Sequence, residues 1–133
     1  MPFLPDTNIW ILLLKHPGGL LEQRFRAQAT RDIFLCSVVK AELWHGAEKY
    51  GDRERRHCAL EKLFAPFISL PFDDQAARHY AAIRHQLEVL GRVIGPNDLK
   101  IAAIARAHGF TLVRADQGFG QVPGLKVEDW SQV

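Results

Sequence analysis

Two aspartates in this sequence directly follow short apolar runs and are the first candidates for chemistry. Asp6 comes just after Phe3-Leu4, and Asp116 comes just after the run Thr111 to Val113. In an open α/β sheet the functional crevice lies beyond the carboxyl ends of the strands, so acids at these positions point to a site. For either residue alone, a turn or cap position is the competing interpretation.

Glu42 is a third candidate because no cation stands beside it on its expected helix. Its neighbours three and four residues away are Val38, Val39, His45 and Gly46. A carboxylate at the border of an apolar face needs compensation, which a bound cation would supply. A solvated edge position is the alternative, and Gly46 would leave room beside the carboxylate.

Asp98 is the fourth candidate, at the start of a largely apolar helix, where the helix dipole favours an ionised carboxylate and simple capping is the alternative. The four acids together are stronger evidence for a shared site than any one of them alone. If Asp6, Glu42, Asp98 and Asp116 converge, their mutual repulsion demands a cation. Ligation by oxygen alone favours Mg²⁺, with Mn²⁺ as a substitute.

The elements that must position these acids alternate between strand-like and helix-like patterns, which predicts βαβ units around a parallel sheet. Strands are expected at Phe3-Leu4, Ile33 to Cys36, Phe67 to Leu70, Thr111 to Val113 and Leu125 to Val127. Helices are expected from Asp73 to Leu90, after a Ser37 cap as far as Gly51, and across Leu99 to Ala105.

Length and composition indicate how many domains the chain forms and which surroundings suit it. The 133 residues, 47% of them hydrophobic, suit a single domain spanning residues 1–133. The net charge of +2 gives little general attraction to nucleic acid, so binding would depend on local cations. The run Ile9 to Leu14 is too short to cross a bilayer, and Cys36 and Cys58 look like reduced thiols, so we expect a cytoplasmic protein without membrane contact.

At these same residues the sequence resembles the PIN-domain ribonucleases of the VapC type over essentially its whole length. The matching motifs are Leu4-Pro5-Asp6-Thr7-Asn8, Ser37 to Glu42 followed by Gly46-Ala47-Glu48-Lys49, Ile94 to Leu99, and the tail from Thr111 through Asp116 and from Phe119 to Trp130. Each motif alone is weak, but their order and spacing together are specific. The resemblance implies a PIN-like three-layer α/β/α domain with a central parallel sheet.

The resemblance also implies site residues and a reaction. Its acidic quartet, which would be catalytic and hold the metal, matches Asp6, Glu42, Asp98 and Asp116, and Thr7, Asn8 and Ser37 would support the site. Lys40, Lys100 and Arg114 lie near the predicted crevice and are candidates for contact with RNA phosphates. Lys100 and Arg114 stand where the family usually has uncharged residues, and a solvent-facing position is the alternative for both. The expected reaction is magnesium-dependent hydrolysis of phosphodiester bonds in structured RNA, with initiator tRNA cut in its anticodon loop as one target. The products would carry a 5′-phosphate and a 3′-hydroxyl.

Family likeness further implies protein partners. Such enzymes are toxins blocked by a VapB-type antitoxin whose C-terminal segment lies across the catalytic groove. They usually form homodimers and toxin–antitoxin hetero-oligomers.

The chain departs from the family pattern at Pro5, where an aliphatic residue is usual. Proline cannot donate a ladder hydrogen bond, so in a central strand it would shift Asp6 or weaken the fold.

The sequence leaves two alternative functions. A receiver-like signalling domain needs an acidic pair after the first strand, where only Asp6 stands. A catalytically weak PIN domain acting as a binding partner in an antitoxin–operator DNA complex is the second alternative, and the intact acidic quartet argues against it.

Overall fold

The computed structural model describes residues 1–115 and 122–131. In chain order the elements are β1 (Phe3–Pro5), α1 (Thr7–Lys15), α2 (Leu20–Arg26), the 3₁₀ turn η1 (Thr30–Asp32), β2 (Phe34–Cys36), α3 (Ser37–Lys49), α4 (Arg53–Phe64), β3 (Ile68–Leu70), α5 (Asp74–Val89), α6 (Pro96–His108), β4 (Thr111–Arg114) and β5 (Val127–Asp129). Helices thus connect most of the strands, as parallel pairing requires.

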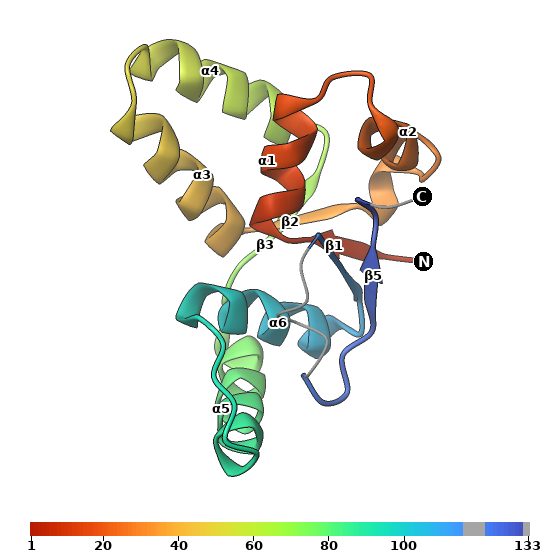
Figure 1. Cartoon of the computed structure of the whole chain (residues 1–133), viewed down its shortest axis with the longest axis vertical. Coiled ribbons are helices and arrows are strands. Elements are labelled where there is room, and N and C mark those ends of the chain that lie inside the picture. Colours follow the sequence, from red (N-terminus) through yellow and green to blue (C-terminus); the bar gives the residue numbers. More distant parts are fainter. Residues whose placement is uncertain (116–121, 132–133) are drawn as a thin grey trace.

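Every strand pair in the described part of the chain is parallel. One sheet has the order β1-β4-β5, and β2 pairs with β3 in a second. A parallel bridge between Phe3 and Ile33 joins the two into the order β3-β2-β1-β4-β5. Figure 1 shows α5 and α6 below the strands and α1, α2, α3 and α4 above them. The predicted three-layer α/β/α arrangement with a central parallel sheet is confirmed.

Pro5 limits the backbone hydrogen bonding between β1 and β2, which meet at the bridge between Phe3 and Ile33. The backbone N–H of Asp6 faces β4 and donates to the Val113 carbonyl at 2.8 Å, so the position of Pro5, one residue earlier, faces β2. Proline has no N–H for that ladder. The Pro5 carbonyl instead accepts a hydrogen bond from Trp10 Nε1 at 3.1 Å. The strand is central, yet Asp6 keeps its ladder bond.

The core is continuous across the sheet. Above it, the fully buried Trp10 ring packs edge-on against Phe25 and Phe67, with centroids 5.2 and 5.1 Å away. Below it, every residue from Ile101 to Ala105 is buried, which confirms the prediction of a helix packed on most sides. Along the helix expected from Asp73 to Leu90, the apolar face is buried at Ala76, Ile83 and Leu87 and half-buried at Tyr80, whereas Leu90, which follows the last residue of α5, is exposed.

Element ends differ from prediction in a few places. The helix predicted to start at Asp73 does start there, since Asp73 is the N-cap of α5 and its Oδ1 accepts from the Ala76 N–H at 2.9 Å. Ser37 was predicted as a cap, but it is the first residue of α3, and the capping position is held by Cys36 without a side-chain bond. The last strand begins at Val127, two residues later than expected.

Both cysteines are free thiols, as the sequence predicted; Cys36 is buried and Cys58 is exposed. Within residues 1–115 and 122–131, no helix combines the length and apolar character needed to cross a membrane.

Candidate active site

Asp6 stands at the carboxyl end of β1, where the chain turns directly into α1. It is the N-cap of α1, and its Oδ1 accepts the Ile9 N–H at 3.0 Å. Only 2% of the residue is exposed. The cap interpretation is therefore confirmed. Capping also fixes a buried carboxylate at the sheet edge where a ligand site is expected, and the role of Asp6 in such a site stays a prediction.

The hydroxyl of Thr7 joins the start of α1 to α3. Its Oγ1 donates to Glu42 Oε1 at 2.5 Å, across 35 positions of sequence. A hydroxyl bond to a charged carboxylate is short and strong and holds the acid in one orientation. The candidate acids Asp6 and Glu42 are thus fixed at the same end of the sheet by neighbouring residues of one helix start.

Glu42 opens onto a groove between α1, α3 and α4. The groove has a volume of about 610 Å³ and its wall includes Lys15, His45 and Gly46 beside Glu42. A methyl group at Gly46 would have no atom within 4 Å, so the space beside Glu42 expected from the sequence is present. The carboxylate is half-buried and accessible from this groove.

Asp98 lies in the first turn of α6, which begins at Pro96 behind the capping residue Gly95. It is exposed, and α6 packs against α3, which carries Glu42. The position at the positive end of the helix dipole agrees with the prediction for an ionised acid. Gly95, and not Asp98, occupies the capping position of α6.

Asp116 falls outside the described residues, so its place in the quartet stays a prediction. Among the residues that are described, no three histidine, cysteine, aspartate or glutamate side chains form a group able to hold a metal ion. Thr7, which directly follows Asp6 in the chain, is hydrogen-bonded to Glu42. The convergence of all four acids remains a prediction.

The pKa of the Cys36 thiol, at the end of β2 and next to the start of α3, is raised by its surroundings. Burial raises the pKa of its thiol to about 11, and the negative charge of Glu42 adds to the rise, opposed by hydrogen bonds from the Val39 and Val38 backbone and by Lys40. The thiol is therefore neutral at physiological pH and serves as a small core residue.

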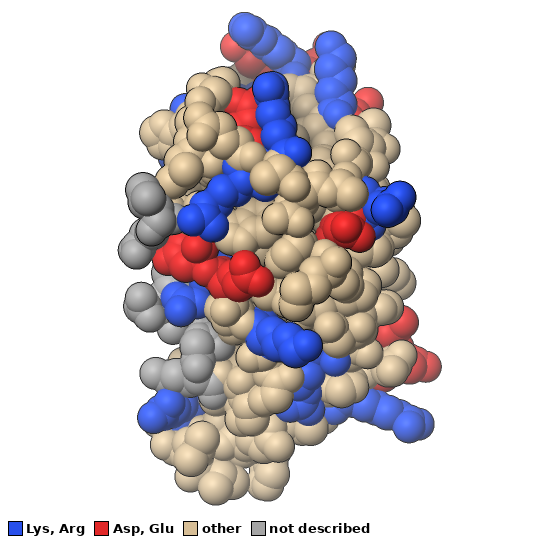
Figure 2. All heavy atoms as spheres, turned by 90° about the vertical axis from the view of Figure 1, so that its right-hand side faces the viewer, with Lys and Arg blue, Asp and Glu red and all other residues tan. Residues whose placement is uncertain are grey.

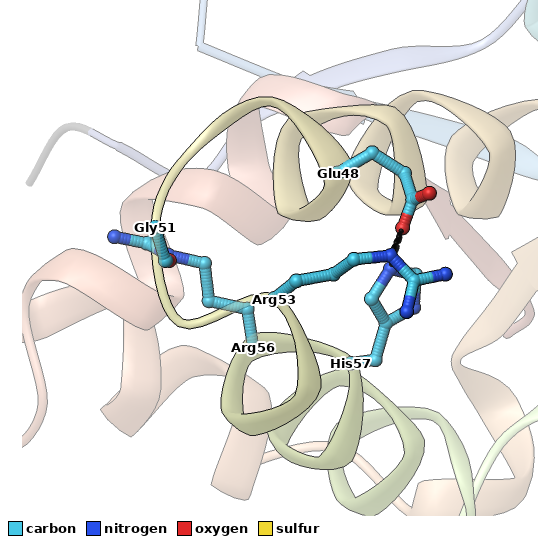
Figure 3. Close-up of polar contacts among 5 residues, drawn as sticks. All are labelled: Glu48, Gly51, Arg53, Arg56 and His57. Atoms are coloured by element: carbon cyan, nitrogen blue, oxygen red, sulfur yellow. Dashed lines mark hydrogen bonds and ion pairs between the residues drawn. The ribbon is translucent and has the colours of Figure 1, made fainter.

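An exposed ion-pair cluster ties the far end of α3 to α4 (Figure 3). The Glu48 carboxylate contacts both Arg53 and, at 2.6 Å, His57 Nε2. These contacts, that with Arg53 first, hold the pKa of Glu48 below its ordinary value. Arg56 Nε donates to the Gly51 carbonyl at 2.8 Å in the connection between the helices. The helix that carries Glu42 is thereby anchored at the end remote from the sheet.

The remaining site candidates take different places. Asn8 and Ser37 are exposed at the starts of α1 and α3. The Lys40 ammonium lies 5.3 Å from the centre of the Phe64 ring. Lys100 is half-buried on α6, close behind Asp98.

Arg114 is the last residue of β4 and pairs in register with Asp129 on β5. No role was assigned to Asp129 from the sequence, because its nearness to Arg114 depends on strand pairing, for which residue spacing holds no signal.

Comparison with known proteins places this geometry in a family. The family model described as PIN domain matches residues 3–125. The chain is 36% identical over 132 residues to a tRNA(fMet)-specific endonuclease VapC from Shigella flexneri, covering 98% of this chain and 99% of the relative. It is 33% identical over 131 residues to a protein of the same name from Salmonella typhimurium, covering 98% of each.

Solved structures agree with the sequence relatives. The fold matches the DNA-bound VapBC structure from Salmonella typhimurium with a TM-score of 0.93 at 33% identity, covering 98% of both chains. VapBC2 from Rickettsia felis, bound to a promoter DNA fragment, gives a TM-score of 0.91 at 31% identity, covering 98% of this chain and 99% of that one. The receiver-like alternative is thereby overturned. The chain belongs to the PIN-domain family, among the VapC ribonucleases.

Proposed function

We propose that this protein is a magnesium-dependent endoribonuclease toxin that hydrolyses phosphodiester bonds in structured RNA. The observation that carries the proposal is the Thr7–Glu42 hydrogen bond, which fixes a half-buried carboxylate at the sheet edge where the buried Asp6 also lies. Two oriented acids at the carboxyl edge of a parallel sheet are the beginning of a metal-dependent hydrolytic site.

The donor set fits a hard divalent cation. Asp6, Glu42, Asp98 and Asp116 offer only carboxylate oxygens, which suit Mg²⁺, with Mn²⁺ as a substitute. When bound, such an ion activates a water molecule and stabilises charge on the phosphate. These four acids would hold it, supported by Thr7, Asn8 and Ser37.

The chain's own residues prepare this site before any ligand arrives. The Ile9 N–H orients the Asp6 carboxylate, and the Thr7 hydroxyl holds one oxygen of Glu42. Fixing acids by hydrogen bonds in advance spares the reaction the cost of ordering them. The packing of α3 on α6 keeps Glu42 and Asp98 on adjoining helices.

RNA binding would come from local cations. On the face that Figure 2 presents, which carries the N-terminus and β5, basic side chains are scattered around a compact acidic group and form no continuous basic surface. The candidates Lys40, Lys100 and Arg114 lie on α3, α6 and β4, the elements around the proposed site. We take tRNA as the leading substrate, because relatives at 36% and 33% identity are named tRNA(fMet)-specific endonucleases.

A VapB-type antitoxin would hold this activity in check in the cytoplasm. Two solved relatives are VapBC assemblies, and the groove beside Glu42 offers a place for a partner's segment. We also expect a homodimer within a toxin–antitoxin hetero-oligomer. The exposed apolar side chains Val89, Leu90 and Val93 near the end of α5 provide surface for protein contacts.

The test is cleavage of transcribed initiator tRNA by the purified protein with Mg²⁺, with EDTA, and with the substitution Glu42→Gln. We expect cutting that is lost with EDTA and falls by at least about a hundredfold in E42Q, because the carboxylate charge is removed with little change of shape. Equal cutting by E42Q, or cutting in EDTA, would refute the proposal. A folded protein that cuts no RNA under any of these conditions would instead favour the alternative role in an antitoxin–operator DNA complex.

A further inference from the structure

Arg114, the last residue of β4, lies in register with the buried acid of the proposed site. In a parallel ladder an N–H bonds to the carbonyl one residue before its register partner, and the Asp6 N–H donates to the Val113 carbonyl at 2.8 Å. Asp6 is therefore the register partner of Arg114, one step beyond the pairing of Pro5 with Val113. Register partners on neighbouring strands lie about 5 Å apart and point to the same face of the sheet.

The charge of Arg114 is not neutralised by any acid of residues 1–115 and 122–131, where it forms no ion pair. Its Nε and Nη1 atoms are buried and have no hydrogen-bond partner there. The register neighbour on the other strand, Asp129, is bound to Ser131 instead, whose N–H and Oγ donate to it at 2.8 and 2.6 Å. A buried cation of this kind is costly unless negative charge nearby offsets it.

Burial also decides what the guanidinium can act on. With Nε and Nη1 covered, Arg114 is poorly placed to bind an RNA phosphate. Its charge nonetheless acts at this edge of the sheet, because the pKa of Asp129 is lowered, first by the Ser131 hydroxyl and to a smaller extent by the positive charge of Arg114. Charges inside a protein are screened less than charges in water, so the same field reaches Asp6.

We infer that Arg114 is a built-in counter-ion of the proposed metal site, which stabilises the neighbouring carboxylates when no metal is bound and weakens the binding of a divalent cation. The inference rests on the proposed function and adds to it a control of metal affinity. Acids that share a site repel one another, and this repulsion favours the binding of a cation. A fixed positive charge beside Asp6 relieves part of that repulsion and also repels the incoming ion. Because a guanidinium keeps its proton at any working pH, this charge is permanent.

Calorimetric titration with MnCl₂ tests the inference on the unsubstituted protein, on Arg114→Gln and on Arg31→Gln. Arg31 is the matched control, because it is exposed and precedes β2, so its removal takes the same charge from the opposite, amino end of the sheet. We expect R114Q to bind Mn²⁺ at least about tenfold more tightly than the unsubstituted protein, and R31Q to bind it unchanged. An unchanged or weaker Mn²⁺ affinity in R114Q would overturn the inference.

A second readout separates the counter-ion role from simple support of the fold. Loss of Arg114 should lower the melting temperature in EDTA, because the acids lose their compensating charge. Added Mn²⁺ should then raise the melting temperature of R114Q by more than it raises that of the unsubstituted protein, since tighter binding stabilises the folded state more. A residue that only supports the fold would lower the melting temperature in EDTA without enlarging this Mn²⁺-induced rise, and that result would refute the inference.

Two further variants keep the test independent of how well R114Q folds. Arg114→Met keeps an apolar stem without the charge and replaces R114Q if that protein does not fold. Arg114→Lys keeps the charge and should bind Mn²⁺ as the unsubstituted protein does, so a tighter affinity in R114K would refute the inference by showing that shape is responsible. Mn²⁺ binding of equal strength with and without the charge overturns the inference alone, whereas no Mn²⁺ binding in any of these proteins would refute the proposed metal site and the inference with it.

Discussion

Thr7 and Glu42, 35 residues apart in sequence, are joined by a hydrogen bond of 2.5 Å between Thr7 Oγ1 and Glu42 Oε1. The bond links the first turn of α1 to the second turn of α3. Asp6 precedes Thr7 directly, so one short stretch of chain supplies a buried acid and orients another. A change at Thr7 should therefore affect the chemistry more than the fold.

Thr7→Val removes the hydroxyl at nearly constant volume. We expect RNA cleavage to fall about 10- to 100-fold, the usual effect of losing a group that orients a metal ligand, with a higher Mg²⁺ requirement. Thr7→Ser keeps the donor and should retain most of the activity. Cleavage rates over a Mg²⁺ titration provide the measurement, and equal rates for T7V and T7S would contradict the role assigned to the hydroxyl.

Cys36 should make stability depend on pH in the alkaline range. Its folded pKa of about 11 lies above the ordinary value of 9.0, so the neutral thiol is favoured by folding. The contribution, about 3 kcal/mol, is fully present below pH 9 and is lost as the pH rises towards and through 11. Urea unfolding at pH 8 and pH 10.5 should show this loss in the unsubstituted protein. Cys36→Ala should lose less between the two pH values, and an identical loss in both proteins would refute the assignment.

The Glu48 cluster should contribute to stability only where its carboxylate is charged. Because the pKa of Glu48 is lowered, its contribution is present above the ordinary value of 4.5 and disappears as the pH falls through the lower folded pKa. Glu48→Gln should therefore lower the melting temperature slightly at pH 7, less so in high salt, and its effect should shrink as the pH is lowered below 4.5. Glu61→Gln, at another exposed glutamate, is the control. A pH-independent effect of E48Q would mean that packing is responsible.

Trp10 should matter to β1 through its bond to the Pro5 carbonyl as well as through its packing. Trp10→Phe leaves that buried carbonyl without its donor and opens a cavity, so we expect a loss of about 2 kcal/mol or more in the free energy of unfolding. Trp44→Phe is the matched control, since Trp44 is 40% exposed. Denaturant titrations of both variants give the comparison, and equal losses would show that the Pro5–Trp10 contact adds nothing.

The predictable part of this protein was the part encoded in local pattern. The apolar run of α6 and the Asp73 cap of α5 could be predicted because each depends on residues within a few turns. The route by which β1 tolerates Pro5 could not, because it depends on which side of the strand faces β2 and on an indole from α1. Ser37 was misplaced by one position because a strand runs into α3 without a loop, so the last strand residue, Cys36, occupies the cap.

The candidate site shows the same division. The lack of a local cation beside Glu42 singled that residue out, but its bond to Thr7 arises only when α1 packs on α3. The sequence predicted Arg114 only as a candidate for RNA contact. Its position between Asp6 and Asp129 follows from the strand order β1-β4-β5, which residue types do not reveal.

The central claim is that these acids act together on a divalent cation, and direct titration of Mn²⁺ into the protein tests it most directly. Calorimetry should be run on the unsubstituted protein, on Glu42→Gln and Asp98→Asn, and on Glu61→Gln as a control. We expect Mn²⁺ binding that Mg²⁺ displaces, weakened at least about tenfold in E42Q and in D98N and unchanged in E61Q. Equal Mn²⁺ affinity in all four proteins would contradict the account.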